Sequence, residues 1–273
     1  MDLYKTITDK IIKRLEEGTI PWRKPFQSME AVNWVTQKPY RGINAILLDG
    51  GEYATFRQIN EAGGRVKKGE KSELIIFWKL VEVEDEGVEG LKKTIPLMRY
   101  YRVFEINTQT EGLKSKSNIK EYKHNPIEEA EKILEGYQEP KFTEKLGKAY
   151  YRPVDDVVNV PPKEDFENVH DYYSTAFHEI VHSTGHEKRL NREGVTELSM
   201  FGDTKYSKEE LVAEIGASFL CGKTGIINKT IDNSVAYIQS WLRALQNDKR
   251  LIVQASQQAQ KAVDYIMGIK YED

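Results

Sequence analysis

Apolar side chains recur at helical spacing near the start of the chain. They run from Tyr4 to Leu15, and Gly18 follows them, which predicts an amphipathic helix over residues 3–17. A second, shorter helix is predicted over residues 56–62, because a capping-box pair precedes it and two glycines follow it.

Two later segments change to the pattern of strands. ELIIFWKLVEV (73–83) and IPLMRYYRVFEI (95–106) are rich in β-branched and aromatic residues, and an acidic EDEGVEG stretch separates them. Residues 107–125 are polar and lack periodicity, which predicts a linker. The first 106 residues are therefore expected to form a small mixed α/β domain.

Helical patterns dominate the second half. Asn125-Pro126 opens a helix that is predicted to end near Gly136, and AYYRPVDDVVNVPP favours an edge strand. Further helices are predicted over residues 167–185, 208–222 and, as a long pair, 233–267. The fold class that follows is α+β with two domains: residues 1–106, then the linker, then a mainly helical domain over residues 126–273.

The composition narrows the class of protein. Charged residues make up 30% of the chain and hydrophobic residues 39%, as in soluble proteins with a real core. We expect no membrane span, because no run of about 18 apolar residues occurs, and no signal peptide at the N-terminus. The single cysteine, Cys221, excludes an internal disulfide and is expected to be a small buried side chain. Together these features favour a reducing, cytoplasmic location.

The net charge of −3 conceals an asymmetry between the two halves. Residues 1–120 hold 21 lysines and arginines against 17 acidic residues, whereas the remainder holds 19 against 26. This excess of positive charge in the first half favours contact with nucleic acid there. The alternative is a chance distribution of charge.

The most specific chemical signal is FHEIVHSTGH, residues 177–186, which holds three of the five histidines. His178 and His182 stand four residues apart, so on a helix both imidazoles lie on one face and can bind one metal ion. Glu179 can then take a proton from a water molecule that the ion activates. This H-E-x-x-H pattern in an apolar helical run predicts the hydrolytic metal site of a metallopeptidase. The alternative is a structural helix with surface histidines.

A third metal ligand must come from elsewhere. The metzincin pattern fails, because it requires a histidine at position 188, where this chain has lysine. The segment after Ser207 offers two carboxylates one turn apart, Glu210 and Glu214. We predict that Glu210 binds the metal and that Glu214 supports the site. The opposite assignment stays open, because Ser207 and Glu210 also have the spacing of a capping box.

Three cationic or titratable side chains follow the histidine helix: His186, Arg189 and Arg192. They could bind a substrate carboxylate or an oxyanion. Equally, they could cap the carboxyl end of the helix, where positive charge is favourable.

The first half interleaves aromatic and cationic residues, as in proteins that bind single strands by base stacking and phosphate contacts. The candidates for DNA binding are Trp22, Trp34, Tyr40, Arg41, Asn44, Lys67, Lys68 and Lys71. The competing interpretation places Trp22, Phe26 and Trp78 in the core or at an interface.

Taken together, these motifs resemble those of the ArdC-type antirestriction proteins of conjugative plasmids, which are related to the TraC primases. The resemblance covers about residues 3–267, in order, with one departure at Glu105, where the family has asparagine. The motifs that carry it are Pro21-Trp22, YRGIN (40–44), TFRQ (55–58), VKKGEK (66–71), HEIVHSTGHEKRLNR (178–192), EELVAEIGASFL (209–220) and YIQSWLRALQNDKR (237–250).

The resemblance implies a single-stranded-DNA-binding domain joined to a zincin-like metallopeptidase domain, and protection of incoming DNA from host restriction. The metal is expected to be zinc (Zn²⁺), although two histidines and a carboxylate also suit manganese (Mn²⁺). A host protein is a candidate peptidase substrate. Two alternatives remain: a DNA-coating protein whose metal is structural, and a cytosolic metalloprotease whose N-terminal half finds a protein target.

Overall fold

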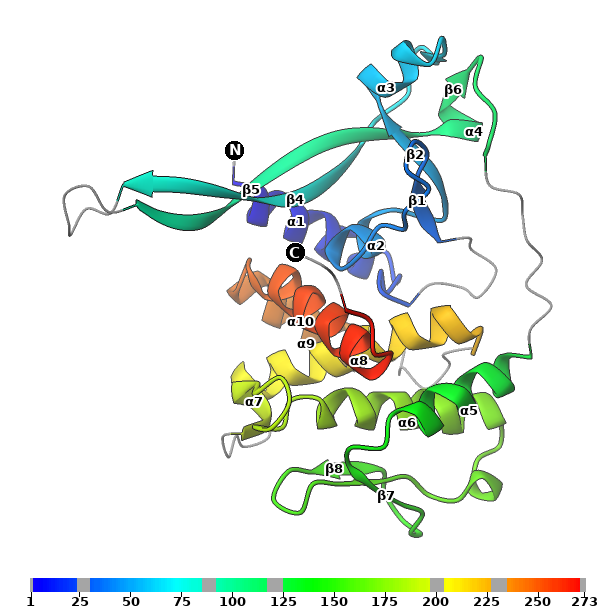
Figure 1. Ribbon diagram of the computed structural model, residues 1–273, viewed down its shortest axis with the longest axis vertical. Coiled ribbons are helices and arrows are strands. Elements are labelled where there is room, and N and C mark those ends of the chain that lie inside the picture. The colour runs from blue at the N-terminus through cyan, green and yellow to red at the C-terminus, as the bar shows by residue number, and fades with distance from the viewer. Residues whose placement is uncertain are drawn as a thin grey trace. The chain divides into compact units, whose positions relative to one another are not determined.

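The chain folds into two compact units in the computed structural model, which describes residues 2–23, 30–84, 92–116, 125–196, 204–226 and 235–270 (Figure 1). The sheet unit comprises residues 28–120. The helical unit comprises residues 1–27 together with residues 121–273. The sheet unit is therefore inserted between the two segments of the helical unit, and the predicted α+β, two-domain class is confirmed.

A four-stranded mixed sheet, in the order β1-β2-β5-β4, organises the sheet unit. Strands β1 and β2 pair in parallel, whereas β5 runs antiparallel to both of its neighbours. The elements of this unit are β1 (Ala31–Asn33), α2 (Ile43–Leu47), β2 (Gly51–Thr55), α3 (Phe56–Glu61), β3 (Arg65–Val66), β4 (Glu73–Glu84), β5 (Lys92–Glu105), α4 (Ile106–Gln109) and β6 (Thr110–Glu111).

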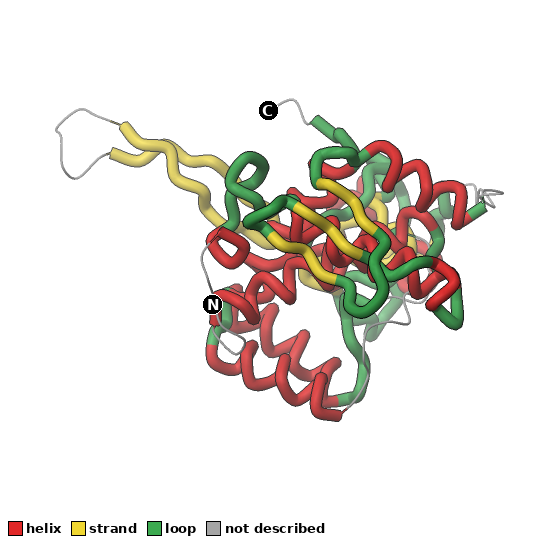
Figure 2. Tube along the Cα trace, turned by 90° about the horizontal axis from the view of Figure 1, so that it is seen from below, coloured by secondary structure: helices red, strands yellow, loops and turns green. Residues whose placement is uncertain are grey.

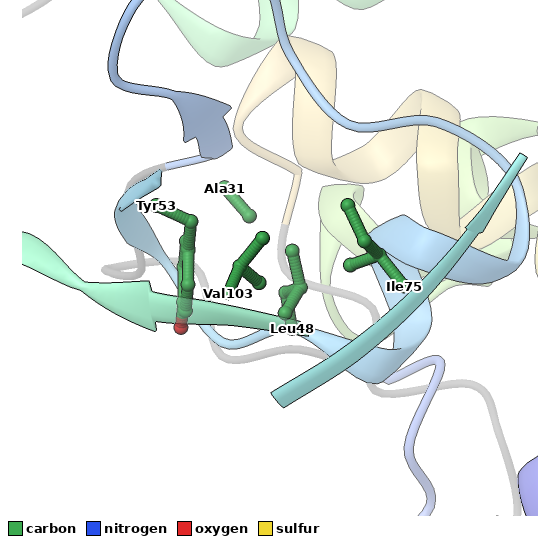
Figure 3. Close-up of a cluster of buried hydrophobic side chains, with 5 residues drawn as sticks. All are labelled: Ala31, Leu48, Tyr53, Ile75 and Val103. Carbon is green, nitrogen blue, oxygen red and sulfur yellow. The ribbon is translucent and has the colours of Figure 1, made fainter. Parts of the chain in front are cut away.

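One core cluster of the sheet unit joins β1, β2, β4 and β5 with the chain just after α2. Figure 3 shows its buried side chains, which lie next to one another: Ala31, Leu48, Tyr53, Ile75 and Val103. Asn44 of α2 anchors the helix to β4, because its side-chain amide exchanges two hydrogen bonds with the backbone of Ile76, at 2.6 and 2.9 Å. The core thus lies at the base of the β4–β5 hairpin.

The rest of that hairpin is a two-stranded ribbon. β2 pairs only with residues 103–105 of β5, while the β4–β5 ladder continues from Glu73–Val103 to Glu84–Lys92. Among the described strands, residues 92–102 therefore pair with β4 alone, and Figure 2 shows the two strands continuing beyond the rest of the sheet. The described part of this ribbon carries exposed side chains on both faces.

Helices make up most of the second unit, with a small three-stranded sheet in the order β7-β9-β8. Its elements are α1 (Leu3–Glu16), α5 (Pro126–Gly136), β7 (Lys141–Thr143), β8 (Tyr150–Arg152), β9 (Val157–Asn159), the 3₁₀ helix η1 (Lys163–Asp165), α6 (Val169–Ser183), α7 (Glu193–Thr196), α8 (Thr204–Thr224), α9 (Val235–Asn247) and α10 (Leu251–Ile266). No described helix has the length and apolar character needed to cross a membrane. Cys221 of α8 is buried, as predicted, and burial raises the pKa of its thiol.

The N-terminal helix α1 belongs to the helical unit, although the sequence prediction grouped it with the DNA-binding domain. Its apolar stripe of Ile7, Ile11 and Leu15 is buried, and the hydroxyl of Thr8 donates a 2.7 Å hydrogen bond to the carbonyl of Lys249, between α9 and α10. An amphipathic pattern reports that a face is buried but not against which partner, so the sequence alone did not assign this helix to its unit.

The predicted linker also differs from the structure. Residues 106–111 form α4 and β6, and the backbone N–H of Lys116 donates to the buried carboxylate of Glu52 at 2.8 Å. Residues 107–116 are therefore part of the sheet unit, while residues 117–124 lie outside the described residues. The single edge strand predicted around residue 150 is instead the hairpin of β8 and β9, which turns at Asp156 with a positive φ of 50°.

Candidate metal centre

Helices α6 and α8 pack closely because small residues of α8 face α6. A Cβ atom added to Gly216 would lie 2.8 Å from a methyl group of Val181, so only glycine permits this approach. Ala213 and Ala217, which flank it on α8, are buried. The close approach brings the carboxylates of α8 within reach of the histidines of α6.

Three side chains converge where the two helices meet. The Nε2 atoms of His178 and His182 lie 3.1 Å apart. The two carboxylate oxygens of Glu210 lie 3.5 Å from these atoms, one oxygen against each imidazole. Ligand atoms about 2.0–2.1 Å from a tetrahedral ion are separated from one another by about 3.3 Å. The donor set therefore fits one small divalent cation without rearrangement.

Glu214 occupies a different position one turn further along α8. Its carboxylate contacts the hydroxyl of Tyr237 and lies 3.4 Å from the indole nitrogen of Trp22. Burial raises the pKa of Glu214 to about 6, against the opposing effects of Tyr237 and His178. α8 already begins at Thr204, so Ser207 lies inside the helix and cannot serve as its N-cap. Glu210 is therefore not needed as part of a cap at Ser207, which removes that competing role.

A buried ion pair between Glu209 and Arg192 contacts His182 on the side of its Nδ1 atom. The Nδ1 atom of His182 lies 3.2 Å from Glu209, and the guanidinium of Arg192 donates to both oxygens of Glu209 at 2.8 and 2.6 Å. The side chains of Arg192 and Glu209 are each only 6% exposed, so solvent does not compete for these bonds. Because an ionised carboxylate only accepts hydrogen bonds, Glu209 holds the proton of His182 on Nδ1 and leaves the Nε2 lone pair directed at the centre.

The electrostatics of the cluster favour a cation. Burial opposes a charge on His178, but the carboxylates of Glu210, Glu179 and Glu214 outweigh it and raise the pKa of this imidazole to about 9. Burial likewise opposes ionisation of Glu209, yet hydrogen bonds from Arg192 and His182 hold the pKa of its carboxyl below the usual value. The negative charge that retains a proton on His178 is equally available to a metal ion.

The side chains that follow α6 hold the end of that helix. Arg189 donates from Nε to the carbonyl of Ser183 at 2.7 Å and binds both oxygens of Asp156. Arg192 donates to the carbonyl of Val181 at 2.8 Å. His186 is 9% exposed, and its Nδ1 accepts from the backbone N–H of Lys188. Of the two interpretations, this geometry favours capping over substrate contact.

The predicted DNA-stacking tryptophans are buried in this structure. Trp22 is 2% exposed and packs edge-on against Trp241 within the helical unit, next to Glu214. Trp34 is 8% exposed, donates from its indole nitrogen to the carbonyl of Lys114 and has the Lys116 ammonium 3.8 Å from its ring. Neither ring has an open face for a nucleobase.

The remaining predicted DNA contacts divide between structural and exposed positions. Tyr40 is half-buried and packs edge-on against Tyr53. The side chain of Asn44 is hydrogen-bonded to the backbone of β4. Lys67 donates to the carbonyl of Thr108 at 2.7 Å, and Arg41 is half-buried. Only Lys68 and Lys71 are exposed. Trp78, which the sequence placed in the core or at an interface, is 40% exposed on β4.

Two residues near the centre, Glu209 and Tyr237, were not among the predicted site residues, and the ion pair between Arg192 and Glu209 was not foreseen. The position of Glu209 beside Glu210 was visible, but nothing in the sequence showed that these consecutive carboxylates contact opposite nitrogens of the His182 imidazole.

Glu179 is 8% exposed and lies on α6, between the two histidines in sequence. The arrangement can therefore hold a divalent cation beside a carboxylate that is able to accept a proton.

Comparisons with known proteins identify relatives of both parts of the chain. Residues 1–104 match the family model of the N-terminal domain of anti-restriction factor ArdC, and residues 128–258 match that of a zincin-like metallopeptidase. Two proteins named DNA primase TraC from Escherichia coli are 33% identical over 98% of this chain. The chain spans only 20% and 27% of their lengths. An uncharacterised Sinorhizobium fredii protein, y4eC, is 29% identical over 97% of this chain and 91% of its own.

Solved structures extend the likeness across both units. The metal-free crystal structure of the antirestriction ArdC protein from plasmid R388 is 38% identical, with a TM-score of 0.79 over 98% of both chains. The Mn(II)-bound structure of that protein is 36% identical, with a TM-score of 0.78 over the same share of each chain. Because the identity and the fold both extend over almost the whole length, this chain belongs to the ArdC family of antirestriction proteins.

Proposed function

We propose that this chain is an accessory protein of a mobile element that protects incoming DNA from host restriction. It would act in the bacterial cytoplasm, with delivery to the recipient cell along with transferred DNA as one route. The sheet unit would bind single-stranded DNA, and the helical unit would carry a metal-dependent peptidase site. Family membership supports the antirestriction role, and the donor set on α6 and α8 supports the peptidase site.

The metal ligands in this proposal are His178, His182 and Glu210. Two imidazoles and one carboxylate, with a position left open, are typical of catalytic zinc sites and also suit manganese. The related R388 protein was crystallised with Mn(II), so Zn²⁺ and Mn²⁺ are both candidates for this chain.

Glu179 is the proposed general base. A bound divalent cation would lower the pKa of a water molecule at the open position to about 7. The carboxylate of Glu179 would accept the proton of that water, because it lies on α6 between the two histidines and is shielded from solvent. His182 would keep its orientation through Glu209. The substrate class is a peptide bond, and a host protein is the proposed source.

The observation that carries this proposal is the cluster of two imidazole nitrogens 3.1 Å apart, each 3.5 Å from an oxygen of Glu210, with Glu179 on the same helix as the histidines. The test is survival of unmodified DNA in a restricting host that expresses wild type, Glu179→Gln or Glu187→Gln. Glu187 is an exposed glutamate just after α6, so its substitution controls for loss of one charge. We expect Glu179→Gln to lose protection and Glu187→Gln to retain it, at equal abundance and equal metal content.

Retained protection by Glu179→Gln would contradict the catalytic role and favour a DNA-coating protein with a structural metal. Absence of protection by wild type would contradict the antirestriction role of this chain. Capture of a host protein without any affinity for DNA would favour a protease with a protein-targeting N-terminal half.

A further inference from the structure

The β4–β5 ribbon has two chemically different faces, because successive residues of a strand point to opposite sides. Partners in the ladder share a face, so Phe77 lies opposite Arg99 and Lys79 lies opposite Leu97 on one side. We call this side the basic face and define it by Phe77, Lys79, Leu97, Arg99 and Tyr101. The other side carries Trp78 opposite Met98, with Tyr100 next along the strand.

An aromatic pair forms a flat surface on the basic face. The rings of Phe77 and Tyr101 are stacked, with centroids 4.7 Å apart and planes 8° from parallel. Tyr101 is 52% exposed, so part of this stack is open to solvent. A flat, exposed aromatic ring can stack on any nucleobase that is not already enclosed in a duplex.

Two cations stand beside the stack. Lys79 and Arg99 are exposed and diagonal neighbours in the ladder, and neither forms an ion pair with any described residue. The register places no acidic residue on the basic face between positions 75 and 83 or between positions 93 and 101. Glu82, on the other face, is already paired with Lys92 at 3.4 Å. The two charges are therefore available to an anionic partner.

We propose that the basic face of the β4–β5 ribbon is where the chain binds single-stranded DNA. A base stacks on Tyr101, and the phosphates beside it contact Arg99 and Lys79. This inference rests on the proposed function, in which the sheet unit binds single strands, and it replaces the buried Trp22 and Trp34 as the stacking residues. A single strand suits the surface because it offers unpaired bases and closely spaced negative charge.

The ribbon itself supplies a matched control, since Tyr100 is the same residue type, is 45% exposed and points to the opposite face. The experiment measures fluorescence anisotropy of a labelled oligodeoxythymidine with the full-length chain, its Tyr101→Ala variant and its Tyr100→Ala variant. Loss of one stacked base weakens binding by at least about fivefold. We expect this loss for Tyr101→Ala and less than a twofold change for Tyr100→Ala.

A salt titration tests the cations separately. Each phosphate contact on a single strand contributes about 0.7 to the slope of log K against log salt concentration. Lys79→Gln/Arg99→Gln should therefore reduce that slope by about 1.4. Lys92→Gln, on the opposite face, should leave it unchanged.

The possible outcomes distinguish a failure of the proposed DNA binding from a failure of the ribbon as its site. If the wild-type chain has no salt-sensitive affinity for the oligonucleotide, the proposed DNA-binding function fails, and the ribbon assignment fails with it. If the wild type binds but Tyr101→Ala binds as tightly, or no more weakly than Tyr100→Ala, the function stands and the ribbon assignment is overturned. If duplex of the same length binds more tightly than the single strand, stacking on Tyr101 is likewise contradicted.

Discussion

The metal centre and the ribbon bring charged side chains together in opposite ways. At the centre, the side chains contact one another: the imidazole of His182 contacts Glu209, and Glu209 accepts hydrogen bonds from Arg192, whose side chain is 6% exposed. On the ribbon, Lys79 and Arg99 stand exposed with no ion pair to any described residue. The first region is organised before its ligand arrives, whereas the second depends on the ligand for its counter-charge.

This difference indicates different kinds of selectivity. A buried network fixes the positions of the donor atoms, so it selects among metal ions by the distance and number of ligands that each ion requires. An exposed aromatic surface beside exposed cations can bind any base, and salt weakens that binding. One chain can therefore combine a geometrically strict centre with a sequence-tolerant surface, and the two should respond differently to substitution.

The largest expected effect comes from breaking the buried ion pair. Arg192→Met leaves Glu209 buried without its cation, which should cost about 3–5 kcal/mol of unfolding free energy. Urea denaturation of the metal-free protein measures this change. Lys188→Met, an exposed cation four residues earlier, is the control and should change stability by about 0.5 kcal/mol or less. A loss below about 1 kcal/mol for Arg192→Met would contradict a buried, ionised pair.

Removing both partners should separate stability from positioning. In Arg192→Met/Glu209→Met, the volume is kept and no charge is left unpaired, so much of the lost stability should return. His182 nevertheless loses the carboxylate that orients it, and affinity for Mn²⁺ or Zn²⁺ should fall about 10- to 100-fold. Competition with a chelating dye measures the affinity. Wild-type affinity in this variant would show that Glu209 does not position His182.

The pH dependence of metal binding should follow His178. Its pKa is raised to about 9, above the value of about 6.5 expected in the unfolded chain, so the protonated imidazole stabilises the metal-free fold fully below pH 6.5. That contribution is lost as the pH rises through 9. A metal ion must displace this proton, so its apparent affinity should rise about tenfold per pH unit from pH 7 to 9. Mn²⁺ titrations corrected for dye protonation test this, and a flat profile would contradict it.

The smallest effects are expected on the ribbon. Tyr101→Ala removes an exposed side chain and its stack with Phe77, worth about 0.2–1 kcal/mol for a cross-strand pair. Thermal unfolding should therefore change little, even though binding of single strands weakens. A stability loss above about 2 kcal/mol would mean that Tyr101 has a structural role. The two regions would then differ less in how much substitution affects their stability.

The elements with strong local signals were predictable. The helix over residues 3–17 appears as Leu3–Glu16, and the capping box at Thr55 and Gln58 is present at the start of α3. The long hairpin was also visible, because both strands are rich in β-branched and aromatic residues. Short strands such as β1 and β7 have three residues each and carry too little pattern to be recognised.

The surroundings of individual side chains were much harder to predict than the helices and strands. Spacing placed His178 and His182 on one face, since a helix imposes that geometry. It could not distinguish a stacking tryptophan from a buried one, because Trp22 and Trp34 acquire their surroundings from Trp241 and Lys116, which are remote in sequence. The role of Arg192 was hidden for the same reason: its partner Glu209 lies on another helix.

The insertion of residues 28–120 between two segments of the helical unit also governs how the protein can be divided. Cutting the chain at the predicted linker would leave the peptidase-like half without α1, whose Ile7, Ile11 and Leu15 are buried, and without Trp22. The complementary fragment would carry an orphaned apolar helix prone to aggregation. A dissection that keeps the helical unit whole would remove the inserted residues 28–120 and join the two segments of that unit. Genetic exchange of whole modules within this family would face the same requirement for two crossovers instead of one.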